Sequence, residues 1–132
     1  MPFWRLMDYH DPQGTNLIRE WYRLQDDETR ASFRFTLGEI VGTRDLNDSP
    51  SFVPCEREHL GLFRIKFEIA KPKKRQFRVA VFRCLNSNQI ILVDGCQKSG
   101  RFTIPPKVFD KALDLEFGYY VDGKGTIYEH NF

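Results

Sequence analysis

With 132 residues, this chain can bury one hydrophobic core but is short for two, so we expect a single domain over residues 1–132. Its 41% hydrophobic and 14% aromatic content excludes a disordered chain. The longest apolar run, residues 90–93, is too short to cross a bilayer, and residues 1–10 lack the basic and then apolar layout of a signal peptide. We therefore expect a cytoplasmic protein without a membrane partner.

The net charge of +2 conceals a strongly basic middle segment. Residues 64–101 hold ten Lys and Arg side chains against two acidic ones, a local charge of +8, whereas both flanking segments are net acidic. Such an asymmetry concentrates positive potential on one part of a small fold. It favours a polyanionic partner.

The first third of the chain predicts a strand followed by two helices. Residues 3–8 favour a short strand. Asn16 can cap a first helix, and Asp26 or Asp27 can cap a second. Apolar side chains recur at helical spacing after each cap, so we expect a helical hairpin over about residues 16–42 with one apolar face.

The middle of the chain predicts an antiparallel meander, because the apolar period changes from 3.6 to 2. Residues 42–54 are polar and contain proline, so we expect a loop there. Residues 63–69 alternate between apolar and charged side chains. In residues 77–82, Phe77, Val79 and Val81 alternate with Arg78, Ala80 and Phe82, and residues 90–93 are continuously apolar. Short turns separate these three strands, which predicts a sheet over about residues 60–96.

The last part of the chain, residues 105–132, predicts a helix and a tail. Pro105 and Pro106 lie where a helix can begin, and an apolar stripe continues to Gly118. A last short strand is expected at residues 126–128. The fold class is therefore α+β, with an N-terminal strand and a helical hairpin packed on one face of a mainly antiparallel sheet, and a C-terminal helix.

The strand alternation predicts a cationic surface on the face that the helices leave open. If the apolar side chains of residues 63–69 point toward the helices, then Arg64 and Lys66 point away, and Arg78 joins them from the next strand. Lys98, in the loop after the third strand, can reach the rim of this surface. Such a cluster suits a phosphodiester, because positioned cations grip the phosphate oxygens and stabilise the additional charge of a pentacoordinate transition state.

Further residues are candidates for binding RNA around this surface. An aromatic ring can stack an unpaired base, and single-stranded RNA is recognised largely through stacking and base edges. Positively charged residues in the turn at residues 71–75 either contact RNA or form a solvated hairpin tip. The RNA-binding candidates are Lys73, Lys74, Arg75, Phe82, Arg101 and Phe102.

The groups that would transfer protons are less evident from the sequence. Cleavage by the RNA's own 2'-hydroxyl requires a base for that proton and an acid for the departing 5'-oxygen. The three histidines, His10, His59 and His130, flank the basic segment, and each is interpreted as a surface or capping residue. A lysine crowded by other cations can act as the base, so Lys66 and Lys98 are the candidates.

Other site chemistries are disfavoured. The chain has no P-loop, no G-x-G-x-x-G, no H-E-x-x-H and no G-x-S-x-G. Acidic residues are nearly absent from the basic segment, which argues against a two-metal nuclease site there. Cys55, Cys84 and Cys96 are widely spaced without a C-x-x-C pair, so we expect free thiols, no zinc and no other cofactor.

Three short motifs in order resemble the RelE/ParE toxin superfamily, in particular its HigB-like branch. The run Gly61-Leu62-Phe63-Arg64-Ile65 resembles the family's G-L-x-E-[LI]-R strand, and Phe77-Arg78-Val79 resembles its [YF]-R-[VI]. Residues 91–98 followed by Thr103-Ile104-Pro105 resemble an apolar strand ending in H-G-F-x-K-K-T, before a threonine and a proline that open the next helix. The matched part covers about residues 60–115.

The resemblance implies a RelE-like fold and the toxin of a type II toxin-antitoxin system. It implies a metal-independent endoribonuclease that cleaves mRNA, free or on the ribosome, and is silenced by a cognate antitoxin protein. Arg64, Arg78 and Lys98 match the family's basic residues, and Lys66 joins the catalytic candidates from the strand-face argument alone. The alternative is a non-catalytic binding protein of this fold, either a gyrase-inhibiting toxin or a nucleic-acid-binding module.

Overall fold

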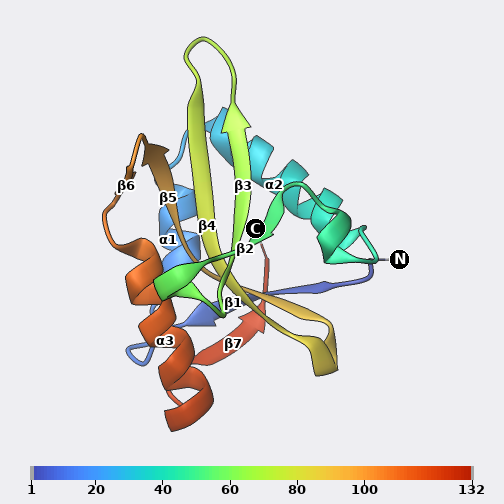
Figure 1. Ribbon diagram of the computed structural model, residues 1–132, viewed down its shortest axis with the longest axis vertical. Coiled ribbons are helices and arrows are strands. Elements are labelled where there is room, and N and C mark those ends of the chain that lie inside the picture. The colour runs from blue at the N-terminus through green and yellow to red at the C-terminus, as the bar shows by residue number, and fades with distance from the viewer. Residues whose placement is uncertain (1, 132) are drawn as a thin grey trace.

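A computed structural model describes residues 2–131 (Figure 1). This part of the chain is α+β, with three α-helices, three short 3-10 helices and a mostly antiparallel sheet of seven strands. In chain order the elements are β1 (Arg5–His10), α1 (Leu17–Arg23), α2 (Asp27–Val41), η1 (Leu46–Asp48), β2 (Phe52–Pro54), η2 (Arg57–His59), β3 (Phe63–Ile69), β4 (Arg75–Cys84), η3 (Leu85–Ser87), β5 (Gln89–Ser99), β6 (Phe102–Ile104), α3 (Val108–Asp122) and β7 (Thr126–Glu129).

The two N-terminal helices begin at the predicted caps. The Asn16 side chain accepts a hydrogen bond from the Arg19 backbone N–H at 3.0 Å, and the Asp26 side chain accepts one from the Thr29 N–H at 2.8 Å. These bonds occupy donors that the first turn of a helix leaves free. Hydrogen bonds from Thr29 and the contact with Arg75 lower the pKa of Asp26 to about 2, so this cap is ionised at neutral pH.

The sheet contains the predicted meander and extends it on both sides. The strand order is β2-β3-β4-β5-β1-β7, and β6 pairs with the far end of β5. Strands β3, β4 and β5 pair antiparallel as predicted, whereas β1 runs parallel to β5. The short strands β2 and β6 were not expected, because three residues between prolines or glycines carry too little periodicity to stand out.

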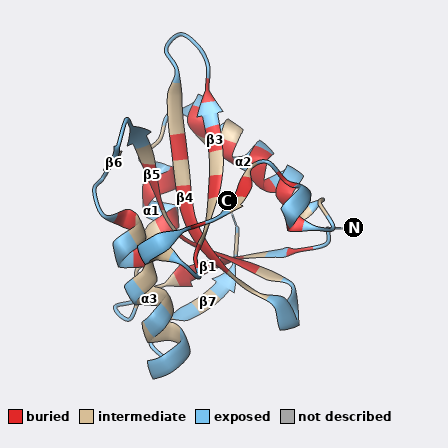
Figure 2. Ribbon diagram, in the orientation of Figure 1, coloured by how far each residue is buried: buried red, intermediate tan, exposed pale blue. Residues whose placement is uncertain are grey.

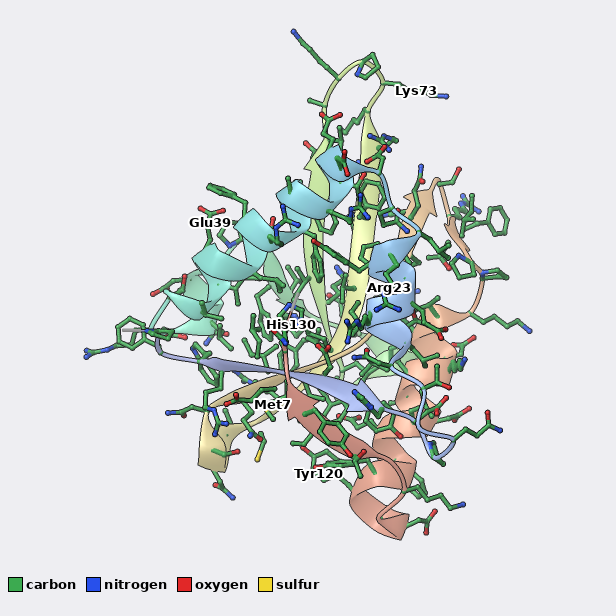
Figure 3. The ribbon with its side chains drawn as sticks, turned by 180° about the vertical axis from the view of Figure 1, so that it is seen from behind. Met7, Arg23, Glu39, Lys73, Tyr120 and His130 are labelled. Atoms are coloured by element: carbon green, nitrogen blue, oxygen red, sulfur yellow. The ribbon has the colours of Figure 1, made fainter. Side chains whose placement is uncertain are left out.

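Helices cover both faces of the sheet, which corrects the expectation that all helices lie on one face (Figures 1 and 3). Helices α1 and α2 pack on one face, around a core that includes Trp21 and Phe33, and α3 packs on the other. The middle parts of β4 and β5 are consequently buried, whereas the ends of these strands are not (Figure 2). Alternation within a strand shows that it has two faces. It does not show which element covers each face.

Two further observations concern membrane-spanning helices and the cysteines. No helix within residues 2–131 is long and apolar enough to cross a membrane. Cys55, Cys84 and Cys96 are free thiols, as predicted.

Glu116 on α3 predicts a pH-dependent loss of stability. It lies beside Leu60 and Phe117 in a small hollow, and burial raises the pKa of its carboxyl to about 7. Below about pH 4.5 the carboxyl is protonated in both the folded and the unfolded state, so it costs the folded state no free energy. Above about pH 7 the carboxyl is ionised in both states, and the folded state bears the full free-energy cost of a partly buried charge. We expect Glu116→Gln to raise the free energy of unfolding by about 1 kcal/mol at pH 8, allowing for solvent screening, and to leave it unchanged at pH 4.

Urea denaturation at the two pH values measures this difference. Asp114→Asn, at an exposed position of the same helix, is the matched control and is expected to change stability little at either pH. An equal effect of Glu116→Gln at pH 4 and pH 8 would contradict the electrostatic origin of the penalty.

Candidate nucleic-acid interface

A groove of about 860 Å³ opens on the face of the sheet that carries α3. Its floor is the part of β3, β4 and β5 that α3 leaves uncovered, and its walls are η2, the β5–β6 hairpin and the start of α3. The groove is lined by Arg64, Lys66, Arg78 and Lys98, the four predicted catalytic residues, and by Arg101 and Phe102, two of the predicted RNA-binding residues.

Strand pairing aligns three of these cations. Lys66 on β3 lies directly opposite Arg78 on β4, and Arg64 is two residues along from Lys66 on the same face. Directly opposite residues of an antiparallel pair have their Cβ atoms about 5 Å apart. The Arg78 guanidinium also donates a hydrogen bond to the Phe77 carbonyl at 2.9 Å, which orients it.

Lys98 lies within β5 and not in the predicted loop after it. It joins this face because β5 contains a bulge. Ala80 pairs with Asp94 but Val81 pairs with Leu92, so β5 has one additional residue at this point. Ile91, before the bulge, and Cys96, after it, therefore pack in the same core cluster on the α3 side although their numbers differ in parity. Lys98 follows Cys96 by two residues and points to the same side.

The four cations are available to an external anion. Within residues 2–131 none of Arg64, Lys66, Arg78 and Lys98 forms an ion pair. Burial, together with the neighbouring charge of Arg64, lowers the pKa of Arg78. A lowered pKa is expected for a guanidinium that is partly desolvated beside another cation. A bound phosphate would offset both the desolvation and the repulsion.

The β5–β6 hairpin supplies an exposed aromatic ring at the rim of the groove. The Phe102 side chain is 77% exposed and lines the groove next to Arg101. A large apolar side chain so exposed contributes little to the core. Beside a cationic groove, it offers a flat face on which a base can stack.

Two of the predicted RNA-binding residues do not belong to this interface. Phe82 lies on the predicted side of β4 but is fully buried, because α3 covers it with the rings of Tyr119 and Tyr120 at centroid distances of 5.7 and 5.6 Å. Its predicted stacking role is therefore wrong. Arg75 lies on the opposite face, where it pairs with Asp26 at 3.0 Å and Glu28 at 3.9 Å and ties the β3–β4 hairpin to α2.

The remaining two predicted RNA-binding residues, Lys73 and Lys74, lie at the tip of the β3–β4 hairpin. Lys73 extends from this tip, away from the body of the protein (Figure 3). Lys74 pairs with Glu68 at 3.7 Å, and neither lysine lines the groove. The tip is therefore separate from the cation cluster.

Sequence reasoning missed a histidine-aspartate pair at the wall of the groove. His59 Nε2 lies 2.6 Å from Asp110 Oδ1, and both residues line the groove. The ring of His59 also packs against Phe109, with centroids 6.0 Å apart. The pair joins η2 to the first turn of α3 across 51 positions of sequence, so no local spacing could have signalled it.

The other histidines lie outside the groove. His10 packs against the ring of Tyr128 with centroids 4.4 Å apart. His130 Nδ1 lies 2.7 Å from Asp8 Oδ1, and this pair is almost fully buried. His59 is thus the histidine that the structure places beside the cation cluster.

Two cysteines near the cations are poor nucleophiles at neutral pH. Burial raises the pKa of Cys55, and burial together with Asp94 raises the pKa of Cys96 to about 12. Both thiols are therefore protonated, and nucleophilic attack by cysteine requires the thiolate. Covalent catalysis by cysteine is not the chemistry that this groove favours.

The groove is mixed in charge, with cations in excess. Six Lys and Arg side chains and three Asp and Glu side chains line it. Among the acidic residues, Glu56 precedes η2, Glu58 lies on it and Asp110 lies at the start of α3. Lys66, Arg78 and Lys98 come from the sheet. Within residues 2–131 no group of three or more His, Cys, Asp or Glu could hold a metal ion.

Comparisons with protein-family models, curated protein sequences and solved structures find no match to this chain.

Proposed function

We propose that this protein is an endoribonuclease that cleaves single-stranded RNA in the groove between η2, the sheet and α3. The observation that supports this most is the convergence of four unpaired cations with an exposed aromatic ring and a histidine-aspartate pair in one groove. The cations match a phosphodiester, the ring matches a base, and the histidine supplies a ring nitrogen that can accept a proton.

The chemistry is attack by the adjacent 2'-hydroxyl of the RNA. The 2'-oxygen forms a bond to phosphorus while the bond from phosphorus to the 5'-oxygen breaks, which leaves a 2',3'-cyclic phosphate and a free 5'-hydroxyl. Arg64 and Arg78 bind the non-bridging oxygens, whose charge increases in the transition state. No redox partner is required, and the bonding electrons stay with the departing oxygen.

His59 is the proposed base for the 2'-hydroxyl proton. A carboxylate bonded to one ring nitrogen orients the imidazole and stabilises the imidazolium that forms when the other nitrogen takes a proton. Asp110 is placed to do this. The ammonium groups of Lys66 and Lys98, in the same groove, can protonate the departing 5'-oxygen.

The biological setting that we propose is the one the sequence resemblance implies. The protein is the toxin of a type II toxin-antitoxin pair, with a RelE-like fold, a cognate antitoxin as partner and mRNA as substrate. The order of the elements from β3 to α3 and the position of the basic residues support this proposal. A short neighbouring open reading frame that encodes a helix-turn-helix protein would support it further.

The test is to incubate purified protein with end-labelled mRNA, with and without ribosomes and with and without EDTA. We expect cleavage that survives EDTA, leaves 2',3'-cyclic phosphate ends, and stops when the nucleotide before the scissile bond is 2'-deoxy. RNA that is bound but never cut, with or without ribosomes, would identify a non-catalytic binding module. Inhibition of DNA gyrase without any RNA cleavage would identify the gyrase-inhibiting alternative.

His59→Gln is expected to lower the rate of RNA cleavage by about a hundredfold, because it removes the proposed base. Asp110→Asn should reduce the rate less, since it disturbs only the orientation of the ring. His10→Gln is the matched control, a histidine outside the groove. An unchanged cleavage rate in His59→Gln would exclude His59 as the base.

A further inference from the structure

A second hollow, of about 480 Å³, lies on the other side of the β3 edge from the groove. Helix α2 forms one wall through Ser32, Phe35, Thr36 and Glu39, and Pro50 with Ser51 closes one end. Lys66 and Arg78 line both this hollow and the groove. The two depressions therefore meet at these two cations.

They meet because part of the β3 edge is uncovered. Strand β2 pairs only with residues 63–65 of β3, and the last backbone contact on this side is from the Lys66 N–H to the Ser51 carbonyl, at 2.8 Å. Beyond Lys66, no other strand among residues 2–131 pairs with this edge of β3. A flexible chain can therefore extend from the groove, over the uncovered edge of β3, into the second hollow beside α2.

Phe35 gives this second hollow an aromatic wall. It is 69% exposed on α2, whereas its neighbour Phe33 is fully buried among the core aromatics. A single exposed hydrophobic residue is ordinary in a folded protein. Phe35, however, lines a hollow that contains two cations and is continuous with a groove that already holds the exposed Phe102.

The acidic side chains of the hollow suit a base better than a phosphate. Glu68 is offset by Lys74, at 3.7 Å. Glu39 lies one helical turn after Phe35, and both side chains line the hollow. A carboxylate beside a stacked base can accept hydrogen bonds from an exocyclic amino group, which guanine, cytosine and adenine carry and uracil lacks.

We propose that the second hollow is a base-binding subsite for single-stranded RNA. One phosphate of the strand binds at Lys66 and Arg78, the bases on one side of it lie along the groove toward Phe102, and a base on the other side stacks on Phe35. Glu39 then makes this subsite prefer a base with an amino group. This inference rests on the proposed RNA-cleaving function, to which it adds a second recognition site.

The experiment is fluorescence anisotropy with 2'-O-methyl RNA oligonucleotides of about eight nucleotides, a length in the range that single-strand-binding folds cover. The methyl group blocks attack by the 2'-oxygen, so binding is measured without cleavage. We expect Phe35→Ala to weaken binding about tenfold. Phe3→Ala is the matched control, since Phe3 is exposed, lies against Arg44 and lines neither depression.

Base preference tests the role of Glu39. We expect an oligonucleotide of uracil alone to bind more weakly than oligonucleotides in which single positions are replaced by cytosine or guanine. Glu39→Gln should reduce that difference and leave binding to the uracil oligonucleotide within about twofold. A base preference identical in Glu39→Gln and in the original protein would remove Glu39 from the subsite.

The outcomes separate this inference from the proposed function. If the protein binds and cuts RNA but Phe35→Ala binds as tightly as the original, the subsite is wrong and the function stands. If Phe35→Ala weakens binding but no RNA is ever cut, the subsite stands and the endoribonuclease proposal fails. If no RNA binds at all, both are overturned, and the hollow is better explained as a contact for another protein.

Discussion

Replacing Arg64 and Arg78 together with alanine is expected to lower RNA cleavage about a thousandfold without loss of the fold. Removing one donor from a site that stabilises transition-state charge typically costs a hundredfold or more, and both guanidinium groups are proposed to hold the same phosphate. Neither side chain forms an ion pair within residues 2–131, so their removal leaves no buried charge unpaired. Single-turnover cleavage of a defined RNA measures the effect.

Lys73→Ala is the matched control for this double variant, because it removes a cation from the hairpin tip and not from the groove. It should cut RNA within about twofold of the original rate, since exposed substitutions away from a site have small effects. Thermal unfolding of all three proteins shows whether the fold is retained. Cleavage by the double variant at the original rate would show that the groove is not the catalytic site.

Gly95→Ala is expected to lower the free energy of unfolding by about 3 kcal/mol, because there is no space for a methyl group at this position. A Cβ at residue 95 would lie 2.3 to 2.6 Å from ring atoms of Trp21. Trp21 cannot yield easily, since its ring packs edge-on against the buried Phe33 with centroids 5.5 Å apart. The measurement is urea denaturation with a linear extrapolation.

Gly38→Ala provides a control of opposite sign. Gly38 lies inside α2, and a Cβ there would meet no atom within 4 Å. Alanine is the better helix former, so we expect a gain in stability of about 0.5 to 1 kcal/mol. If Gly95→Ala were as stable as the original protein, the close packing of Trp21 on α1 against Gly95 would be wrong.

The Gly95 variant also tests how the site is assembled. Gly95 lies next to the bulge that brings Lys98 to the face carrying α3, and α1 packs directly over it. A shift of β5 to accommodate the methyl group should therefore displace Lys98 and reduce cleavage in the fraction that remains folded. Gly38→Ala changes α2 and not β5, so this variant should cut RNA normally.

Local pattern was sufficient for most elements and for three of the cations. Asn16 and Asp26 cap their helices as expected, because an N-cap depends only on its own side chain and the next three residues. Strand β3 has the predicted bounds, and period-2 alternation was enough to place Arg64, Lys66 and Arg78 on one face. The lining of the groove by these side chains follows from that alternation.

The packing between distant elements could not be predicted from local sequence patterns. Phe82 has the parity of Arg78, yet it is buried, because α3 covers one end of this face and leaves the other open. His59 meets Asp110 because α3 starts beside η2. Both facts depend on how the chain connects these elements in space. Neither segment contains a periodic sequence pattern that would reveal this connection.

The sequence by itself determined the α+β class, the helix caps, the antiparallel meander and a basic face on it. Each of these depends on neighbours within a few positions, where periodicity and side-chain chemistry act directly. Only the tertiary structure decided that α3 covers one end of this face, that a one-residue bulge turns Lys98 toward it, and that His59 and Asp110 meet at the wall of the groove. These features arise from contacts between elements far apart in sequence, and the choice among such contacts is made by packing the whole core.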